Sequence, residues 1–361
     1  MNLVGLDAAS KTVGLYKGCG SIPPPSAKQL YKYLVMKKLI EIKNSNIRTL
    51  RINYDLGNTC NYKCWYCFPD ANTGTVYWPD VDVVKKNVVK LINYYLDNNI
   101  VDEVQISLVG GEPTLWKELG EFARYVKENA TCKLYLITNG SRTIRWWKEY
   151  ADYFDSINIS IHHEQVNLDH IEDLAKVLYK KNLCFFTDVL MDHKEWDKCQ
   201  SIVNRLCSSG TKFMVLAKPI HINGETFYSD EQRLYLQTHL KRKPALKTIL
   251  KYWKTFNSIA KIEATFDNGE VVKTTNEHYF IVNMLHNFQG WQCNLGINFL
   301  FIDRLGNLSG TCKQRLYGLD GYYNINDIEF AEKFNPKIKP VVCEQRLCLC
   351  SAETALTKKR T

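Results

Sequence analysis

The chain has 361 residues, 45% of them hydrophobic and 24% charged, as in an ordinary globular protein. No run of eighteen apolar residues occurs, and the first residues lack the basic and long apolar regions of a signal peptide, so we expect no membrane span and a cytoplasmic protein. Thirteen cysteines without such a leader indicate a reducing compartment, where thiols serve metals rather than disulfides.

The formal net charge of +9 is spread along the chain, with its densest points at Lys241-Arg242-Lys243 and Lys358-Lys359-Arg360. A solvated surface is one explanation for such a charge. The other is attraction to an acidic partner, such as nucleic acid, an acidic peptide or a flavodoxin-like electron donor. Charge alone does not choose between them.

Residues 1–46 are predicted to be an N-terminal extension, in which three consecutive prolines at 23–25 favour a stiff, extended polyproline II segment. From residue 47 to 220, strands alternate with apolar residues at helical spacing. The predicted strands are 50–56, 104–109, 133–137, 156–161, 184–190 and 212–217, and the predicted helices are 81–98, 115–129, 143–154, 168–181 and 195–207. Six β-then-α units imply an α/β protein with a parallel sheet and right-handed crossovers.

Residues 221–260 form a predicted helical bridge that is rich in lysine and aromatic residues. After it the pattern changes to β-hairpins with cysteines, which marks a smaller second domain over 261–361. The first hairpin turns at Asp267-Asn268-Gly269, a strong hairpin signal, and the second turns at Arg304-Leu305-Gly306-Asn307.

Three cysteines at CxxxCxxC spacing, Cys60, Cys64 and Cys67, follow the first predicted strand at once. Iron–sulfur clusters are usually held by four thiolates, but the next cysteine is Cys132 and the first histidine is His162. A 4Fe–4S cluster on these three thiols would keep one iron open, and an open position distinguishes catalytic from structural metal sites. A zinc site is the alternative, although three cysteines alone do not complete one.

The spacing, with the aromatic Tyr66 before the last cysteine, resembles the signature loop of the radical S-adenosylmethionine (radical SAM) enzymes. The resemblance implies a SAM-binding 4Fe–4S cluster on the three thiols, whose open iron chelates the amino and carboxylate groups of SAM. It also implies an open (β/α)6 partial TIM barrel for residues 47–220.

Gly110-Gly111-Glu112-Pro113 follows the second predicted strand directly. Ligands of parallel sheets bind beyond the carboxyl ends of the strands, and paired glycines let the backbone approach a ligand closely. In radical SAM enzymes a GGEP segment binds the methionine amino group of SAM, so the resemblance assigns these four residues to cofactor binding. A simple turn is the alternative.

Two further strand ends carry candidate ligands. Thr138-Asn139-Gly140 resembles the family's turn beside the cofactor, although Asn139 also suits a helix cap. Ser160 stands where relatives place a ribose-contacting serine, but the following acidic residue is replaced by His162 and His163, a departure from the pattern. These histidines are candidates for substrate contact or proton transfer, or else only pack and hydrogen-bond.

Five cysteines lie in the last 69 residues: Cys293, Cys312, Cys343, Cys348 and Cys350. Their placement around the second hairpin resembles a SPASM or twitch auxiliary-cluster domain. Five suit the single-cluster twitch form, in which four would bind a second 4Fe–4S cluster, although the C-x₄-C-x-C ending departs from the twitch ending. A structural zinc knuckle is the alternative.

The resemblance therefore implies an enzyme that reductively cleaves SAM to a 5′-deoxyadenosyl radical and abstracts a hydrogen atom from its substrate. An auxiliary cluster suits net oxidation, so an oxidoreductase or maturase is expected, with a flavodoxin- or ferredoxin-like reductant as partner. We expect a peptide or protein substrate, with a carbohydrate or nucleotide-derived small molecule as the second possibility. The hypothesis of another class is a non-catalytic zinc or iron–sulfur protein that binds nucleic acid, but we do not expect a nucleic-acid partner.

Overall fold

The computed structural model describes residues 37–67, 70–209, 214–220, 222, 227–240, 261–275, 279–309, 322–336, 338–344, 346–348 and 354–360. The proline-rich part of the predicted extension, residues 241–260 of the predicted bridge, Cys312 and Cys350 lie outside them. Within these ranges no helix is long and apolar enough to cross a membrane.

The larger sheet has eight strands in the order β12-β11-β2-β3-β4-β5-β6-β7. Six of them run parallel and neighbour one another in chain order: β2 (Thr49–Asp55), β3 (Glu103–Val109), β4 (Lys133–Thr138), β5 (Ser156–Ile161), β6 (Cys184–Met191) and β7 (Val215–Pro219). All six carboxyl ends therefore lie at the same edge of the sheet.

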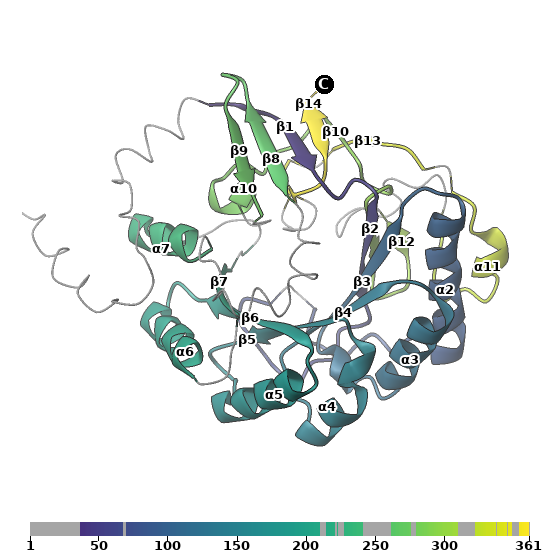
Figure 1. The fold of residues 1–361 in the computed structure, drawn as a ribbon, viewed down its shortest axis with the longest axis horizontal. Helices are drawn as coiled ribbons and strands as arrows, with labels where there is room; N and C mark the ends of the chain where they lie inside the picture. Colours follow the sequence, from purple (N-terminus) through teal and green to yellow (C-terminus); the bar gives the residue numbers. More distant parts are fainter. Residues whose placement is uncertain are drawn as a thin grey trace, which may run out of the picture. The chain divides into compact units, whose positions relative to one another are not determined.

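A helix follows each of the first five parallel strands: α2 (Val81–Asp97), α3 (Leu119–Asn129), α4 (Ile144–Tyr150), α5 (Leu168–Lys180) and α6 (Trp196–Ser208). Figure 1 shows these helices as an arc outside the curved row of strands. Two short 3₁₀ helices, Pro113–Leu115 and Ala151–Tyr153, lie before α3 and after α4. Another helix, α7 (Asp230–Leu240), follows β7.

The two faces of the parallel strands differ in polarity because side chains alternate along a strand. In β2, Leu50, Ile52 and Tyr54 are buried in the core with the helices. Each such apolar side chain contributes roughly 1.5–3 kcal/mol when fully buried. Arg51 and Asn53 alternate with them and are half-buried on the opposite side. We call this side, which faces away from α2 to α6, the inner face of the sheet.

The second sheet has the order β13-β10-β14-β1-β8-β9. Its strands are β1 (Leu39–Asn44), β8 (Ile262–Phe266), β9 (Val271–Thr274), β10 (Trp291–Cys293), β13 (Val341–Val342) and β14 (Lys358–Arg360). The short helices α10 (Tyr279–Val282) and α11 (Phe330–Lys333) lie in the same half of the sequence. Although β1 lies in the predicted N-terminal extension, it pairs antiparallel with β8 and β14.

The two predicted C-terminal hairpins join different sheets. The β8–β9 hairpin belongs to the second sheet and turns at the predicted residues, where Gly269 has a φ of 82°. In the other hairpin, β11 (Phe299–Ile302) pairs antiparallel with β12 (Leu308–Ser309) and parallel with β2. The C-terminal part of the chain thus extends the larger sheet beside the strand that precedes the three cysteines.

The predicted mixed α/β fold with a parallel sheet is confirmed. The largest shift in a strand is at β7, which begins at Val215 rather than at 212. The full (β/α)6 barrel, the separate C-terminal domain and the domain boundaries stay predictions.

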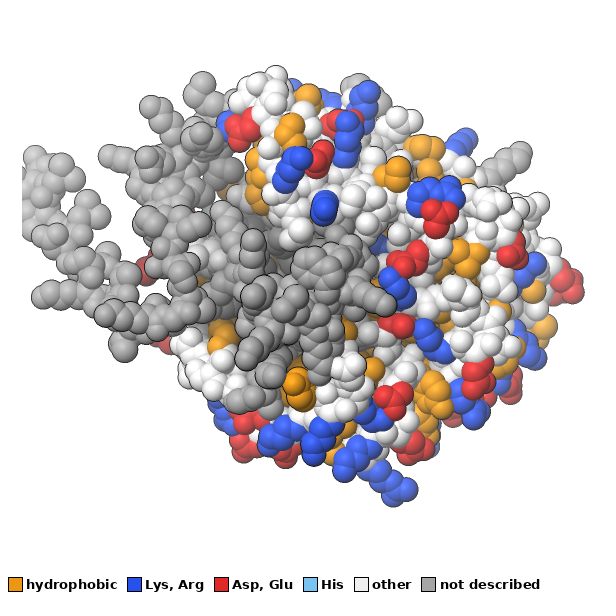
Figure 2. All heavy atoms as spheres, viewed as in Figure 1, with side chains coloured by type: hydrophobic (Ala, Val, Ile, Leu, Met, Phe, Trp, Pro, Cys, Tyr) orange, Lys and Arg blue, Asp and Glu red, His pale blue; other side chains and the backbone are white. Residues whose placement is uncertain are grey.

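Basic and acidic side chains are intermingled on the surface in view (Figure 2). Ion pairs also join neighbouring elements, such as Lys85 with Glu121 and Lys127 with Asp155. This mixture agrees with the solvated-surface explanation of the net charge.

Candidate metal centre

The three cysteines lie in the loop between β2 and α2, and Asn58 closes the neck of that loop. Its Nδ2 donates to the carbonyl of Asp70 at 2.8 Å and to the hydroxyls of Thr73 and Thr75 at 2.7 and 2.9 Å. Its Oδ1 accepts from the amide of Val76 at 2.8 Å. One buried side chain therefore joins the two ends of the segment that contains the cysteines.

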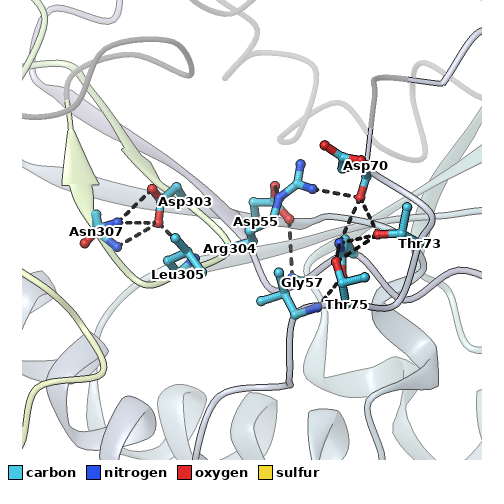
Figure 3. A network of polar contacts seen from close by, with 11 residues as sticks. Asp55, Gly57, Asp70, Thr73, Thr75, Asp303, Arg304, Leu305 and Asn307 are labelled. Carbon is cyan, nitrogen blue, oxygen red and sulfur yellow. Dashed lines mark hydrogen bonds and ion pairs between the residues drawn. The ribbon is translucent and has the colours of Figure 1, made fainter.

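Arg304, in the turn between β11 and β12, holds the same loop from outside (Figure 3). Its Nε lies 3.3 Å from a carboxylate oxygen of Asp55 at the end of β2, and a terminal nitrogen donates to the carbonyl of Asp70 at 2.9 Å. The turn is itself ordered by Asp303, which accepts from the backbone and side-chain amides of Asn307. The C-terminal hairpin thus fixes both flanks of the cysteine loop.

The three thiols differ in exposure: Cys64 is buried, Cys60 is half-buried and Cys67 is exposed. Burial raises the pKa of Cys64 to about 12, partly offset by a hydrogen bond from Tyr66, with smaller contributions from the other two thiols. Burial likewise raises the pKa of Cys60. The charges of Cys60 and Cys67 contribute to the shift of Cys64, and the charge of Cys67 contributes to that of Cys60, so the three side chains lie within electrostatic range of one another.

The arrangement of the three thiols is compatible with a 4Fe–4S cluster. Among the described residues, no three Cys, His, Asp or Glu side chains converge on one point that could hold a single metal ion. In a 4Fe–4S cluster each thiolate binds a different iron, so the thiolates need no common point. Three neighbouring thiols on one braced loop therefore suit the cluster that the spacing predicts.

Tyr66 and His162 adjoin the buried thiol. The Nδ1 of His162 lies 3.3 Å from the Sγ of Cys64 and 3.1 Å from the hydroxyl of Tyr66. The rings of Tyr66 and His162 stack with their centroids 5.9 Å apart. Burial, followed by the nearby positive charge of Lys218, lowers the pKa of His162 to about 4. The imidazole is therefore neutral at physiological pH.

Gly110 and Gly111 allow the end of β3 to approach the cysteine loop. The amide of Gly111 donates to the carbonyl of Gly57 at 2.8 Å. A Cβ on Gly110, whose φ is 135°, would lie 2.6 Å from that carbonyl oxygen, and a Cβ on Gly111 would lie 2.3 Å from the carbonyl oxygen of Thr59. No larger residue fits either position without moving the loop, which is a structural reason for both glycines.

Glu112 has a buried carboxylate that accepts four hydrogen bonds from neighbouring residues. It accepts from the amide and hydroxyl of Thr114, the hydroxyl of Thr138 and the amide of Asn139, at 2.6 to 3.1 Å. Burial raises the pKa of Glu112, and these donors partly oppose the shift. Pro113, also buried, begins the following 3₁₀ helix. The carboxylate thus joins the ends of β3 and β4, while its predicted role in cofactor binding stays a prediction.

Asn139 and Ser160 lie on two neighbouring strand ends. The side chain of Asn139 donates to Asn61 of the cysteine loop at 2.9 Å and accepts from the amide of Ser141 at 2.9 Å. It therefore ties the end of β4 to the loop instead of capping α4, which Thr143 caps. Ser160 is half-buried on β5 and pairs in register with Asp188 of β6.

His163 belongs to a different cluster from His162. Its Nε2 lies 3.2 Å from Asp192, which follows β6 and also accepts from the indole of Trp65 at 2.7 Å and from the amide of Lys194 at 2.8 Å. Burial alone would raise the pKa of Asp192, but these donors outweigh it and lower the pKa. His163 is buried and anchors a carboxylate that holds the cysteine loop, so its contacts are those of a positioning residue.

The inner face of the sheet carries a polar group that the sequence did not predict. Asp188 of β6 accepts from Asn158 of β5 at 2.9 Å and from Lys218 of β7 at 3.0 Å. The Oδ1 of Asn158 is buried and has no hydrogen-bond partner among the described residues. Because Lys218 also affects the pKa of His162, this group adjoins the cysteine loop. Only the alternation of polar and apolar residues along β5 could have indicated it.

The three C-terminal cysteines that the structure describes divide between two apolar clusters. Cys343 and Cys348 pack near Trp291, whose carbonyl accepts from the amide of Cys343 at 2.8 Å. Cys293 packs with Leu295 in another cluster. Because the other two predicted ligands lie outside the described residues, the auxiliary cluster stays a prediction.

Comparison with known proteins gives a family for part of the chain. Residues 54–198 match the model described as "Radical SAM superfamily". The chain is 35% identical over 117 residues to an "S-adenosylmethionine-dependent nucleotide dehydratase" of Fibrobacter sp. (strain UWH6), covering 32% of this chain and 34% of that protein. It is 29% identical over 141 residues to a "GTP 3′,8-cyclase" of Pasteurella multocida (strain Pm70), covering 35% of this chain and 39% of that protein.

The chain spans between about a third and a half of the length of the first curated relatives that it matches. Among solved structures, one titled "Native anSMEcpe with bound AdoMet and Cp18Cys peptide" aligns with 80% of this chain and 81% of that one, at 16% identity and a TM-score of 0.45.

Proposed function

Residues 54–198 form a radical SAM superfamily domain, and from that premise we propose that this protein abstracts hydrogen from a polar, nucleotide-derived small molecule. The family implies a 4Fe–4S cluster and SAM as cofactors. When bound and reduced, the cluster supplies the electron that cleaves SAM to methionine and a 5′-deoxyadenosyl radical. The residues of this chain bind, orient and shield these groups.

The observation that carries the proposal is the braced cysteine loop beside the paired glycines. Cys60, Cys64 and Cys67 would bind three irons, and Asn58 and Arg304 keep their loop in place. Gly110 and Gly111 bring the backbone at the end of β3 against that loop, where the methionine part of SAM would bind. A Cβ on either glycine would clash with the backbone of that loop, at Gly57 or at Thr59.

The inner face of the sheet favours a polar substrate. Asn158, Asp188 and Lys218 present an unpartnered amide oxygen, a carboxylate and an ammonium near the cysteine loop. Arg51 adds a guanidinium on the same face of β2. Ribose hydroxyls and phosphates pair with such groups, because buried polar atoms need hydrogen-bond partners.

The relatives favour a nucleotide over the peptide that the sequence analysis placed first. One is a nucleotide dehydratase and the other a GTP cyclase, and neither name includes a peptide. We therefore place the nucleotide-derived substrate first and the peptide second. The expected net oxidation has no support from these names, since removal of water is not an oxidation. The auxiliary cluster and a flavodoxin- or ferredoxin-like reductant remain part of the proposal.

Substrate-dependent formation of 5′-deoxyadenosine tests the proposal. We expect a panel of nucleoside triphosphates to stimulate it in the reconstituted enzyme, and a panel of cysteine- and serine-containing peptides to leave it at the basal rate. Lys218→Met should raise the KM for the stimulating nucleotide by tenfold or more, because a charge-assisted hydrogen bond contributes about 1.5–3 kcal/mol.

Lys198→Met is the matched control, because Lys198 is an exposed lysine on α6. Stimulation by peptides alone would refute the nucleotide substrate. An unchanged KM in Lys218→Met would remove the inner-face group from the substrate site.

A further inference from the structure

The turn after β5 surrounds the Sγ of Cys64 with polar groups that the cofactor motifs do not explain. The Nδ1 of His162 lies 3.3 Å from this sulfur, and the Nε2 of Gln165 lies 3.7 Å from it. Tyr66 adds a hydroxyl that hydrogen-bonds to the same thiol. By contrast, the Sγ of Cys60 accepts a hydrogen bond from a backbone amide, that of Tyr62 at 3.3 Å.

The orientation of the Gln165 amide is fixed by a backbone group. The amide N–H of Lys63 lies 3.1 Å from the Oε1 of Gln165, and a backbone N–H can only donate. The oxygen of the side chain must therefore face Lys63, which directs its NH₂ group towards Cys64. Although amide oxygen and nitrogen are alike in size, the hydrogen-bond network assigns them here.

His162 is held in place by two aromatic rings. It stacks on Tyr66 with an interplanar angle of 10° and meets Tyr62 edge-on at a centroid distance of 6.0 Å. Both tyrosines belong to the cysteine loop, so the imidazole and the thiol are positioned by the same segment. This packing keeps the Nδ1 next to the sulfur.

We propose that His162 and Gln165 donate hydrogen bonds to the thiolate of Cys64 and raise the reduction potential of the cluster that it binds. This inference rests on the proposed function. Hydrogen bonds to the sulfurs are among the factors that set cluster potentials. They stabilise the reduced cluster more than the oxidised one, because reduction adds negative charge. The two residues tune the acceptance of the electron from the reductant without touching the substrate.

Two variants remove the donors with little change of shape. Gln165→Glu keeps an oxygen for the Lys63 amide but replaces the NH₂ by a second oxygen that repels the thiolate. His162→Phe keeps the aromatic stack but loses the nitrogen. Gln289→Glu, at an exposed position in the C-terminal half of the chain, is the matched control for the added charge. Redox titration followed by electron paramagnetic resonance gives the midpoint potential, and iron per chain gives the loading.

We expect each donor variant to make reduction at least tenfold less favourable, which is a shift of 59 mV or more to negative potential for a one-electron couple. The iron content and the potential of Gln289→Glu should match wild type. If Gln165→Glu fails to load iron, the midpoint potential of His162→Phe alone tests the inference. Loaded wild type and loaded variants with equal potentials would overturn this inference and leave the proposed function intact, whereas wild-type protein that binds no cluster would overturn the function itself.

Discussion

Removing the guanidinium of Arg304 should loosen the cysteine loop. Its ion pair with Asp55 is largely shielded, since 12% of the Asp55 side chain and 26% of the Arg304 side chain are exposed. Burial already raises the pKa of Asp55, and Arg304 opposes that shift. In Arg304→Met the carboxylate would lose its cation and the carbonyl of Asp70 would lose its donor.

The expected cost follows from these two contacts. Hydrogen bonds to charged groups contribute about 1.5–3 kcal/mol, and the partial exposure of Arg304 places this site near 2 kcal/mol. A loss of about 2 kcal/mol corresponds to roughly 30-fold faster local opening. Hydrogen–deuterium exchange measures such opening directly, and the relevant amides are those around residues 56–76. Arg145→Met, at an exposed position on α4, is the matched control.

A double-mutant cycle separates the ion pair from the rest of the effect. In an Asp55→Asn background no carboxylate is left without its cation, so Arg304→Met should cost only about 1 kcal/mol for the remaining hydrogen bond. Exchange in Arg304→Met within twofold of wild type would refute the reasoning. So would equal costs of the arginine substitution in the two backgrounds.

Two further predictions concern the end of β3. Gly111→Ala should abolish SAM cleavage, because its Cβ would lie 2.3 Å from the carbonyl oxygen of Thr59. Retained cleavage in Gly111→Ala would show that the loop gives way. Burial raises the pKa of Glu112 above its ordinary value of 4.5. Above pH 4.5 the folded protein therefore holds a proton on Glu112 that the unfolded chain releases, so the free energy of unfolding falls as the pH rises. The urea midpoint of wild type should therefore fall relative to Glu112→Gln as the pH rises from 4.5, and parallel pH profiles would contradict this.

Local patterns predicted the parts of the site that are contiguous in sequence. The CxxxCxxC loop and the glycine pair were identified because spacing and strand ends are readable from a few residues. The residues that hold this loop from distant parts of the sequence were not predicted. Arg304 contacts Asp55, which lies 249 positions earlier in the sequence, because β11 pairs in parallel with β2. No period or motif in the sequence encodes that pairing.

The same reason applies to the pairing of β1. Residues 39–44 lie in the predicted N-terminal extension, and no local pattern indicates their partner strands. In the structure they form β1, in which Ile42 pairs with Ala264 of β8 and with Lys358 of β14. Such long-range pairing depends on tertiary packing, which propensity does not report. Gln165 was not predicted for a related reason, since its contact with Cys64 depends on how two loops meet in the fold.

The most direct test of the account is an iron and SAM-cleavage measurement on anaerobically reconstituted protein. We would determine iron and sulfide per chain and the 5′-deoxyadenosine formed after reduction, in wild type and in Cys64→Ala. About four irons for the cluster on this loop, or about eight if the C-terminal cysteines hold a second one, with 5′-deoxyadenosine lost in Cys64→Ala, is the predicted result. Zinc in place of iron, with no cleavage of SAM by the wild-type protein, would contradict the account.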